Sequence, residues 1–197
     1  MSSISVAGDV SGAISIAAPS AAGSGVLTLP TGTDTLVGKA TTDTLTNKTL
    51  GTGTVFPAGA VLQVVSASTS TQVSSSSSTY ADTGLTATIT PRNTSSKILV
   101  LVSQQCRKTN GNINNGTDIK LFRDATDLGK RIYAQGYTNS LLETYTQAAF
   151  QYLDSPSTTS ATVYKTQFAN NAGNFASVVV QADSIGVSII TLMEIAG

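Results

Sequence analysis

From residue 57 onward, the chain alternates short apolar segments with clusters of turn residues, and no stretch keeps a helical period. Alternation of apolar and polar residues predicts strands with one buried face, because successive side chains of a strand point to opposite sides. The segments with this pattern are Ala60–Ser66, Thr79–Thr90, Lys97–Ser103, Asp118–Arg123, Leu141–Leu153, Ala161–Phe168, Ala176–Val180 and Ser188–Ile195. So many short strands with Gly, Asn, Ser and Pro between them predict an all-β fold, an antiparallel β-sandwich that is jelly-roll-like.

The pattern also separates central strands from connections. Lys97–Ser103 is too continuously apolar for an exposed sheet, and we expect it to be a central strand. Ser74–Ser78 has no apolar residue and is expected to be a loop, and Asn110–Gly116 is expected to be a hairpin tip. Asp124 and Asp127 should flank a turn, where Asp often bonds to nearby backbone.

The first 56 residues have a different character. They hold no aromatic residue before Phe56 and only five charged residues, so a core of their own is not expected. Two short apolar alternations, Ala13–Ala17 and Gly25–Pro30, predict brief strands, which need a partner surface because an isolated hairpin is marginal in water. We therefore predict two parts, an extended N-terminal attachment arm of residues 1–56 and a β-sandwich head of residues 57–197; a disordered tail is the alternative for the first part.

Composition narrows the function classes. Lys and Arg number 11, Asp and Glu also number 11, and charged residues are only 11% of the chain, so no electrostatic field favours nucleic acid or an anionic membrane as partner. Histidine is absent, which removes the usual general base and the commonest metal ligand. The amino end lacks the features of a signal peptide, so synthesis in a cytoplasm is expected.

An enzymatic function is the competing class, and a polysaccharide hydrolase is its best form. Glycosidases need a pair of carboxylates, and nothing in the spacing of the acidic residues marks one. The acidic residues of the head are Asp82, Asp118, Asp124, Asp127, Glu143, Asp154, Asp183 and Glu194. Asn110–Asp118 holds one carboxylate, too few for a calcium loop. We expect no catalysis, no metal and no cofactor.

Four further residues are candidates for chemistry or contact. Cys106 is the single cysteine, which excludes an intrachain disulfide, and we expect it to be a small buried apolar residue. Tyr133, Tyr137 and Tyr145 are candidates for exposed contact with a partner or receptor, since tyrosine supplies rigid contact area. Tyrosines half-buried in a sheet are the alternative.

Several segments of the head together resemble a known family. The segments are Ala60–Val65, the Ser/Thr-rich stretch up to Tyr80, Ile89–Val102, Tyr152–Pro156 and Ile190–Ile195. They are similar to the β-sandwich head domain of fibre, spike and capsid decoration proteins of tailed bacteriophages, especially cyanophage-like aquatic phages. In the arm, Ser11–Ile16, Gly25–Pro30 and Thr41–Leu50 resemble the attachment and neck segments of the same proteins.

The resemblance implies a homotrimeric virion protein. No shaft separates the arm from the head domain, which suits a capsid decoration, or cement, protein. Such a protein lies on the outer capsid surface and stabilises the capsid through contact with the major capsid protein. A short tail fibre that binds a host receptor or surface glycan is the alternative. The residues expected to attach the arm to the capsid are Ile14, Ile16, Val26, Leu27, Leu29, Leu36, Val37, Leu45 and Leu50.

Overall fold

The structure, a computed structural model, describes residues 3–7, 13–17, 54–109, 114–172 and 177–197. The chain divides into two compact units, Met1–Gly51 and Thr52–Gly197. The boundary predicted between residues 56 and 57 lies a few residues beyond this division. In the described ranges no helix is long and apolar enough to cross a membrane.

The described part of the first unit is an antiparallel hairpin of β1 (Ser3–Ala7) and β2 (Ala13–Ala17). Its second strand coincides with one of the two strands predicted in the arm. The pairing register sets Ile4 opposite Ile16 and Val6 opposite Ile14. Because strand positions alternate between faces, these four apolar positions share one face of the hairpin and the Ser and Ala positions share the other.

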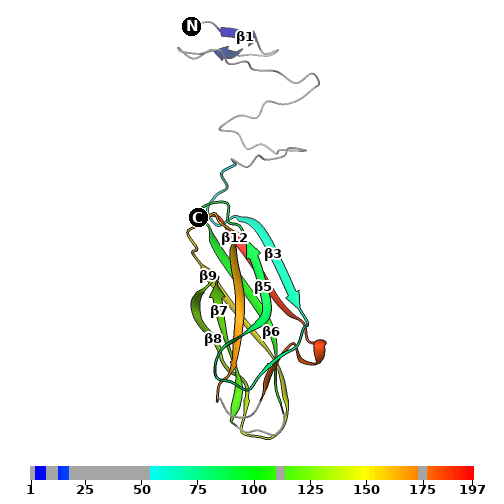
Figure 1. Ribbon diagram of the computed structural model, residues 1–197. Helices are drawn as coiled ribbons and strands as arrows, with labels where there is room; N and C mark the ends of the chain where they lie inside the picture. The colour runs from blue at the N-terminus through cyan, green and yellow to red at the C-terminus, as the bar shows by residue number, and fades with distance from the viewer. Residues whose placement is uncertain (1–2, 8–12, 18–53, 110–113, 173–176) are drawn as a thin grey trace. The chain divides into compact units, whose positions relative to one another are not determined.

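The second unit, called the head below, is a sandwich of two antiparallel sheets, as the sequence predicts (Figure 1). Its elements are β3 (Val61–Thr69), β4 (Val73–Ser75), β5 (Ala81–Ile89), β6 (Lys97–Lys108), β7 (Asn115–Arg123), β8 (Thr126–Thr138), β9 (Thr144–Asp154), β10 (Thr162–Asn170), β11 (Val178–Val180), the 3-10 turn η1 (Ala182–Ser184) and β12 (Ser188–Ile195). The first sheet contains β3, β12, β6 and β9, and the second contains β5, β10, β7 and β8.

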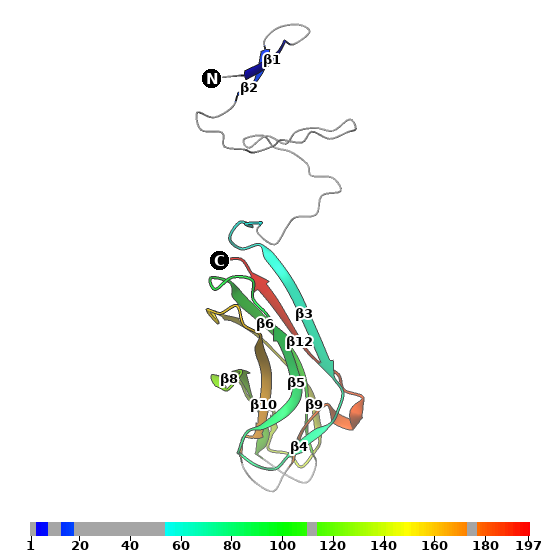
Figure 2. The ribbon, with the colours of Figure 1, turned by 45° about the horizontal axis from the view of Figure 1, so that its top comes forward.

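The strand pairing identifies the sandwich as a jelly roll. In the first sheet, β4 and β11 extend the β3–β12 pair at one end, with η1 interrupting the ladder and projecting from the sheet (Figure 2). The strands therefore pair as nested hairpins: β3 with β12, β5 with β10, β6 with β9, and β7 with β8. A long hairpin rolled in this way gives the two four-stranded sheets of a jelly roll.

Several sequence predictions about these elements need correction. Asn115 and Gly116, expected in a hairpin tip, belong to β7, and residues 110–113 of that tip lie outside the described residues. β6 is a central strand, as predicted, but it continues to Lys108. Ser74 and Ser75 belong to β4 and not to a loop. The strand predicted to begin at Leu141 begins at Thr144, and the whole of β8 was missed. The turn between Asp124 and Asp127 is confirmed in part, because Asp124, with φ 51°, separates β7 from β8, while Asp127 lies inside β8.

The core has two apolar clusters separated by a polar layer. One cluster is built on Ile98, Val100, Leu121, Tyr164 and Leu192, and the other on Cys106, Ile119, Phe168, Val178 and Val180. Cys106 is fully buried, as expected, and burial raises the pKa of its thiol to about 12. The polar layer between the clusters links both sheets through buried side chains.

The polar layer is a chain of hydrogen bonds. Gln104 Nε2 donates to Ser188 Oγ at 2.9 Å, and Thr166 Oγ1 donates to Gln104 Oε1 at 2.9 Å. The hydroxyls of Thr83 and Thr166 are 2.6 Å apart. All four residues are fully buried, and a buried polar group without a partner is costly, so this layer fixes the register of one sheet against the other.

Glu194 is a fully buried carboxylate that predicts a pH dependence of stability. Burial opposes its ionisation, but the hydrogen bonds it accepts, from Gln63 Nε2 at 2.6 Å and the Arg92 N–H at 2.7 Å among others, lower its pKa. Its contribution is therefore present above the ordinary glutamate pKa and is lost as the pH falls through the lowered value. Glu194→Gln should be about 2 kcal/mol less stable at neutral pH, with a deficit that shrinks at acid pH.

Urea unfolding of the wild type and of Glu194→Gln across an acid pH series measures this difference. Asp82 and Asp127 also have lowered pKa values, but they are present in both proteins, so the difference isolates Glu194. A deficit that stays constant down to about pH 3 would show that the carboxylate's charge does not contribute.

Candidate functional site

The outer face of the β3–β12–β6–β9 sheet is the main candidate site. Strand alternation turns the residues between the buried core positions of β6 and β12 outward, and half of them are apolar. We call this surface the apolar face; its apolar members are Val61, Val64, Leu99, Leu101, Ala149, Leu153, Ile189, Met193 and Ile195. Val61, Val64, Leu153 and Ile189 are 43–56% exposed.

Cross-strand pairing arranges the apolar face in rows. Val64, Met193, Leu99 and Leu153 are neighbours across all four strands and form one apolar row. The next row is Ser66, Thr191, Leu101 and Gln151, and the third is Ser68, Ile189, Ser103 and Ala149. None of these three rows holds a charged residue, so the middle of the face is neutral; seven of its twelve positions are apolar and the other five are Ser, Thr or Gln.

A shallow apolar groove of about 510 Å³ lies on this face. Leu101, Ser103, Ala149, Ile189 and Thr191 contribute to its lining. The small residues Ser103 and Ala149 are directly paired, which leaves space that Leu101 and Ile189 border. The groove is therefore shaped for an apolar side chain and offers few groups for hydrogen bonding.

Charges appear only at the two ends of the apolar face. Lys97 is at the end where β6 begins. At the other end, Arg107 Nη1 lies 3.0 Å from Asp183 Oδ1 and 3.2 Å from Glu143 Oε1. Arg107 also donates to Tyr145 Oη at 3.2 Å, and the Tyr145 hydroxyl donates to Asp183 Oδ2 at 3.1 Å. The hydrogen bond to Tyr145 and the neighbouring carboxylates raise the pKa of Arg107 despite partial burial.

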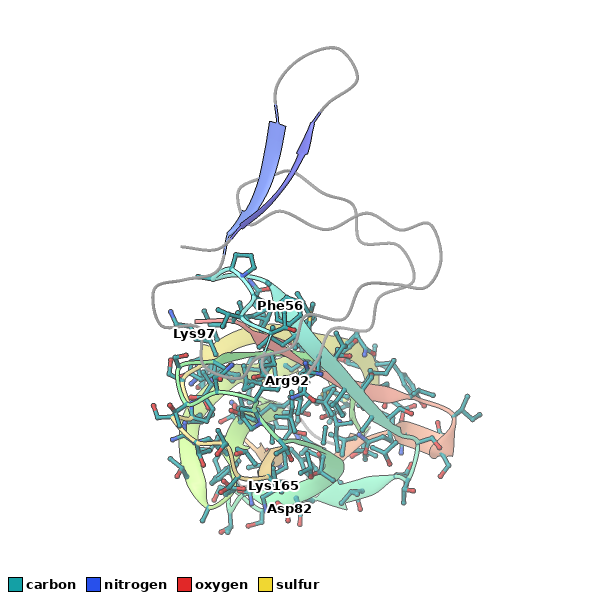
Figure 3. All side chains as sticks on the ribbon, turned by 90° about the horizontal axis from the view of Figure 1, so that it is seen from above. Phe56, Asp82, Arg92, Lys97 and Lys165 are labelled. Atoms are coloured by element: carbon teal, nitrogen blue, oxygen red, sulfur yellow. The ribbon has the colours of Figure 1, made fainter. Side chains whose placement is uncertain are left out.

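The outer face of the β5–β10–β7–β8 sheet is polar and charged, unlike the apolar face. A row across β5, β10, β7 and β8 contains Asp82, Gln167, Lys120 and Lys130. Figure 3 shows Asp82 and Lys165 side by side on this sheet, with Lys165 Nζ 3.0 Å from the Asp82 carboxylate. Lys120 pairs with Asp127 at 2.5 Å, and Lys130 pairs with Asp118. Solvated pairs such as Asp82–Lys165 and Lys120–Asp127 contribute little stability, so this face is suited to remain in water.

The three candidate tyrosines are exposed, but they do not form one site. Tyr133 and Tyr137 lie on β8 and Tyr145 on β9 of the other sheet; they are 72%, 53% and 54% exposed. Tyr145 is held by Arg107 and Asp183, and Tyr137 Oη donates to Asn114 Oδ1 at 3.0 Å. The Lys130 ammonium lies 4.9 Å from the centre of the Tyr133 ring. Their role in partner contact stays a prediction.

Two exposed leucines between β8 and β9 are not among the contact residues that the sequence predicts. Leu141 and Leu142 are 61% and 72% exposed. The buried Lys108 fixes this connection, since its Nζ donates to Ser140 O at 2.6 Å and to Leu142 O at 3.1 Å. Burial lowers the pKa of Lys108. An adjacent apolar pair in a short connection is the available sequence signal, but the apolar pattern predicts a strand that begins at Leu141.

The predicted arm residues fall mostly outside the described ranges. Ile14 and Ile16 lie on β2 and share the apolar face of the hairpin. The structure adds Ile4 and Val6 of β1 to that face, and the alternation Ile4-Ser5-Val6 was the sequence signal for them. The other predicted attachment residues, which lie outside the described residues, are Val26, Leu27, Leu29, Leu36, Val37, Leu45 and Leu50.

Among the acidic residues of the head, Glu143 and Asp183 share Arg107 as their partner, whereas Asp154, Asp124 and Glu194 each have a different one. Asp154 accepts two hydrogen bonds from Arg123 Nη1, at 3.0 and 2.9 Å. Asp124 Oδ1 accepts from the Val163 N–H at 2.9 Å, and Glu194 is buried as described above.

At the end of the head near Phe56, a hollow of about 320 Å³ includes Phe56 and Arg92, which Figure 3 shows with Lys97 at that end.

Comparison with known proteins gives little similarity. No protein-family model and no curated protein matches the chain. The VP2 subviral particle of infectious bursal disease virus, a crystal structure, has 12% sequence identity and a TM-score of 0.35, over 70% of this chain and 38% of that chain. A structure of the Gt strain of the same virus has 14% identity and a TM-score of 0.35, over 78% and 43%. This chain thus spans less than half of either, and TM-scores this low support no argument about function.

Proposed function

We propose that this chain is a non-enzymatic bacteriophage virion protein, a homotrimeric capsid decoration protein on the outer capsid surface. The observation that carries the proposal is the division into a self-contained jelly-roll head and a separate N-terminal unit whose hairpin gathers its apolar positions on one face. That architecture suits a protein that attaches by one part and projects the other. The resemblance of the arm and head segments to phage attachment and head domains points the same way.

The attachment mechanism follows from the hairpin. Two strands cannot bury a face by themselves, so Ile4, Val6, Ile14 and Ile16 would be buried against a partner, for which we propose the major capsid protein. Burial of apolar surface contributes about 25 cal/mol per Å². One small hairpin therefore binds weakly, but the three arms of a trimer bind together and gain by avidity. Decoration would stabilise the shell by linking neighbouring capsid subunits.

A short tail fibre that contacts a host receptor or surface glycan is the second candidate. It is favoured by the exposed apolar side chains near the β8–β9 connection, Tyr137, Leu141 and Leu142. Aromatic and apolar groups held on a rigid scaffold are common contacts in recognition surfaces. Under both candidates the partners are proteins or glycans, and neither nucleic acid nor membrane is a proposed partner.

The copy number in purified virions tests the proposal. Quantitative mass spectrometry, with the major capsid protein as the reference, should find hundreds of copies of this protein per virion if it decorates the capsid. A few to a few dozen copies would assign it to the tail and favour the second candidate. Absence from purified virions would overturn both.

A further inference from the structure

The apolar face is exposed in the single chain although its sequence is typical of a covered surface. Lys97–Ser103 is a continuously apolar run, the pattern of strands that are packed on both sides. The core covers its inner positions, Ile98, Val100 and Val102, whereas Leu99 and Leu101 face outward beside Met193 and Leu153. A contiguous apolar surface of this kind on a folded domain marks an interaction site.

We propose that a second copy of this chain covers the apolar face, which is thus the subunit interface of the assembly. The inference rests on the proposed function for its threefold symmetry, but the choice of face rests on the head alone. The interior of an interface is poor in charge, and the three central rows contain none. A neutral apolar face meets no like-charge repulsion when it packs on a neighbouring identical chain.

The size of the face suits such an interface. Four strands at about 4.8 Å spacing, over about ten residues at 3.3 Å each, give roughly 600 Å² of sheet before side-chain relief is counted. A standard interface buries about 800 Å² on each partner. The opposite sheet, with its Asp82–Lys165 and Lys120–Asp127 pairs, would be expensive to desolvate and remains in solvent.

The groove supplies a place for a side chain of the neighbouring copy. Leu101 and Ile189 border a hollow whose floor holds the small residues Ser103 and Ala149. A flat apolar sheet alone would slide, because its contacts are not directional. A side chain seated in the groove fixes the register of the two subunits, as packed anchors do at interface centres.

The test compares two charge substitutions on opposite faces of the full-length protein. Leu99→Asp places a carboxylate at the centre of the apolar face, and Thr88→Asp places one at an exposed position of β5 on the other sheet. Light scattering should find the wild type and Thr88→Asp at three times the 20.1 kDa chain mass. Leu99→Asp should be monomeric, with association weakened roughly a thousandfold, because an unpaired buried charge is costly.

A labelling experiment keeps the test valid if Leu99→Asp folds poorly. Ser103→Cys places a thiol in the groove, and Thr88→Cys places one on the solvent face. Cys106 should not interfere, because it is fully buried and its thiol pKa is raised to about 12. Maleimide should react with Ser103→Cys only after dilution dissociates the assembly, and with Thr88→Cys at every concentration.

The outcomes separate this inference from the proposed function. A wild type that is monomeric at all concentrations, or an assembly that Leu99→Asp leaves intact with Ser103→Cys freely labelled, would overturn the inference, while copy number in virions would still test decoration. A dimer that Leu99→Asp dissociates would support the interface and contradict the threefold symmetry of the proposed function.

Discussion

Deletion of residues 1–56 is expected to abolish binding of the protein to virus particles and to leave a folded head. The head is a compact unit with both of its sheets and both core clusters intact without the arm. The arm carries the hairpin with its shared apolar face, and a trimer that loses three weak attachment points loses their avidity as well. Co-sedimentation with undecorated particles should show binding weakened by about a hundredfold or more.

A point substitution in the hairpin refines this experiment. Ile16→Asp places a charge on the apolar face of β2, whereas Ser15→Asp places the same charge one residue away, on the other face. We expect Ile16→Asp to reduce particle binding strongly and Ser15→Asp to have little effect. Full decoration by the truncated head would show that the arm does not attach the protein.

The strands that the sequence predicts most accurately are those with one side buried in the core of the head and the other side facing outward. Ser188–Ile195 was predicted with the bounds of β12, because its apolar residues alternate with residues that face outward. Thr79–Thr90 corresponds to β5 for the same reason: Leu85, Ala87 and Ile89 are buried and the threonines between them are exposed. Period-two burial is a local property, so a local pattern is enough to detect it.

β8 could not be predicted from the same pattern because its pairing with β7 is irregular. The register shifts four times along this hairpin, and Ala134 and Gly136 have positive φ. Each shift moves later side chains to the other face, which destroys a simple alternation in the sequence. The partners that complete this hairpin, such as the Ala134 N–H donating to Asp118 Oδ1 at 2.8 Å, depend on the fold and not on local sequence.

The sequence predicts only part of the candidate site. The continuous apolar run of β6 predicted correctly that this strand is central, but it did not reveal that one of its faces lacks a cover in the single chain. The apolar face depends on rows that combine residues from β3, β6, β9 and β12, which are distant in sequence. Such a surface appears only when the nested pairing of the jelly roll is known.

Asp154→Ala is expected to lower the free energy of unfolding by about 3 kcal/mol, which is a large share of the stability of a small domain. Asp154 on β9 joins the two sheets: its carboxylate accepts from Arg123 Nη1 on β7 and, at 2.6 Å, from the Tyr164 hydroxyl on β10. Burial, together with the bond to Asp154, raises the pKa of Tyr164 well above the ordinary tyrosine value, so the hydroxyl keeps its proton and remains a donor.

Removal of this carboxylate leaves two groups without their partner, the fully buried Tyr164 hydroxyl and the Arg123 guanidinium, which is about one quarter exposed. Tyr164→Phe is the matched control, because it removes a single hydrogen bond and leaves the Arg123–Asp154 pair; it should cost about 1 kcal/mol. Urea unfolding of both variants measures the two values. Equal losses would mean that the Arg123–Asp154 ion pair contributes nothing beyond the tyrosine hydrogen bond.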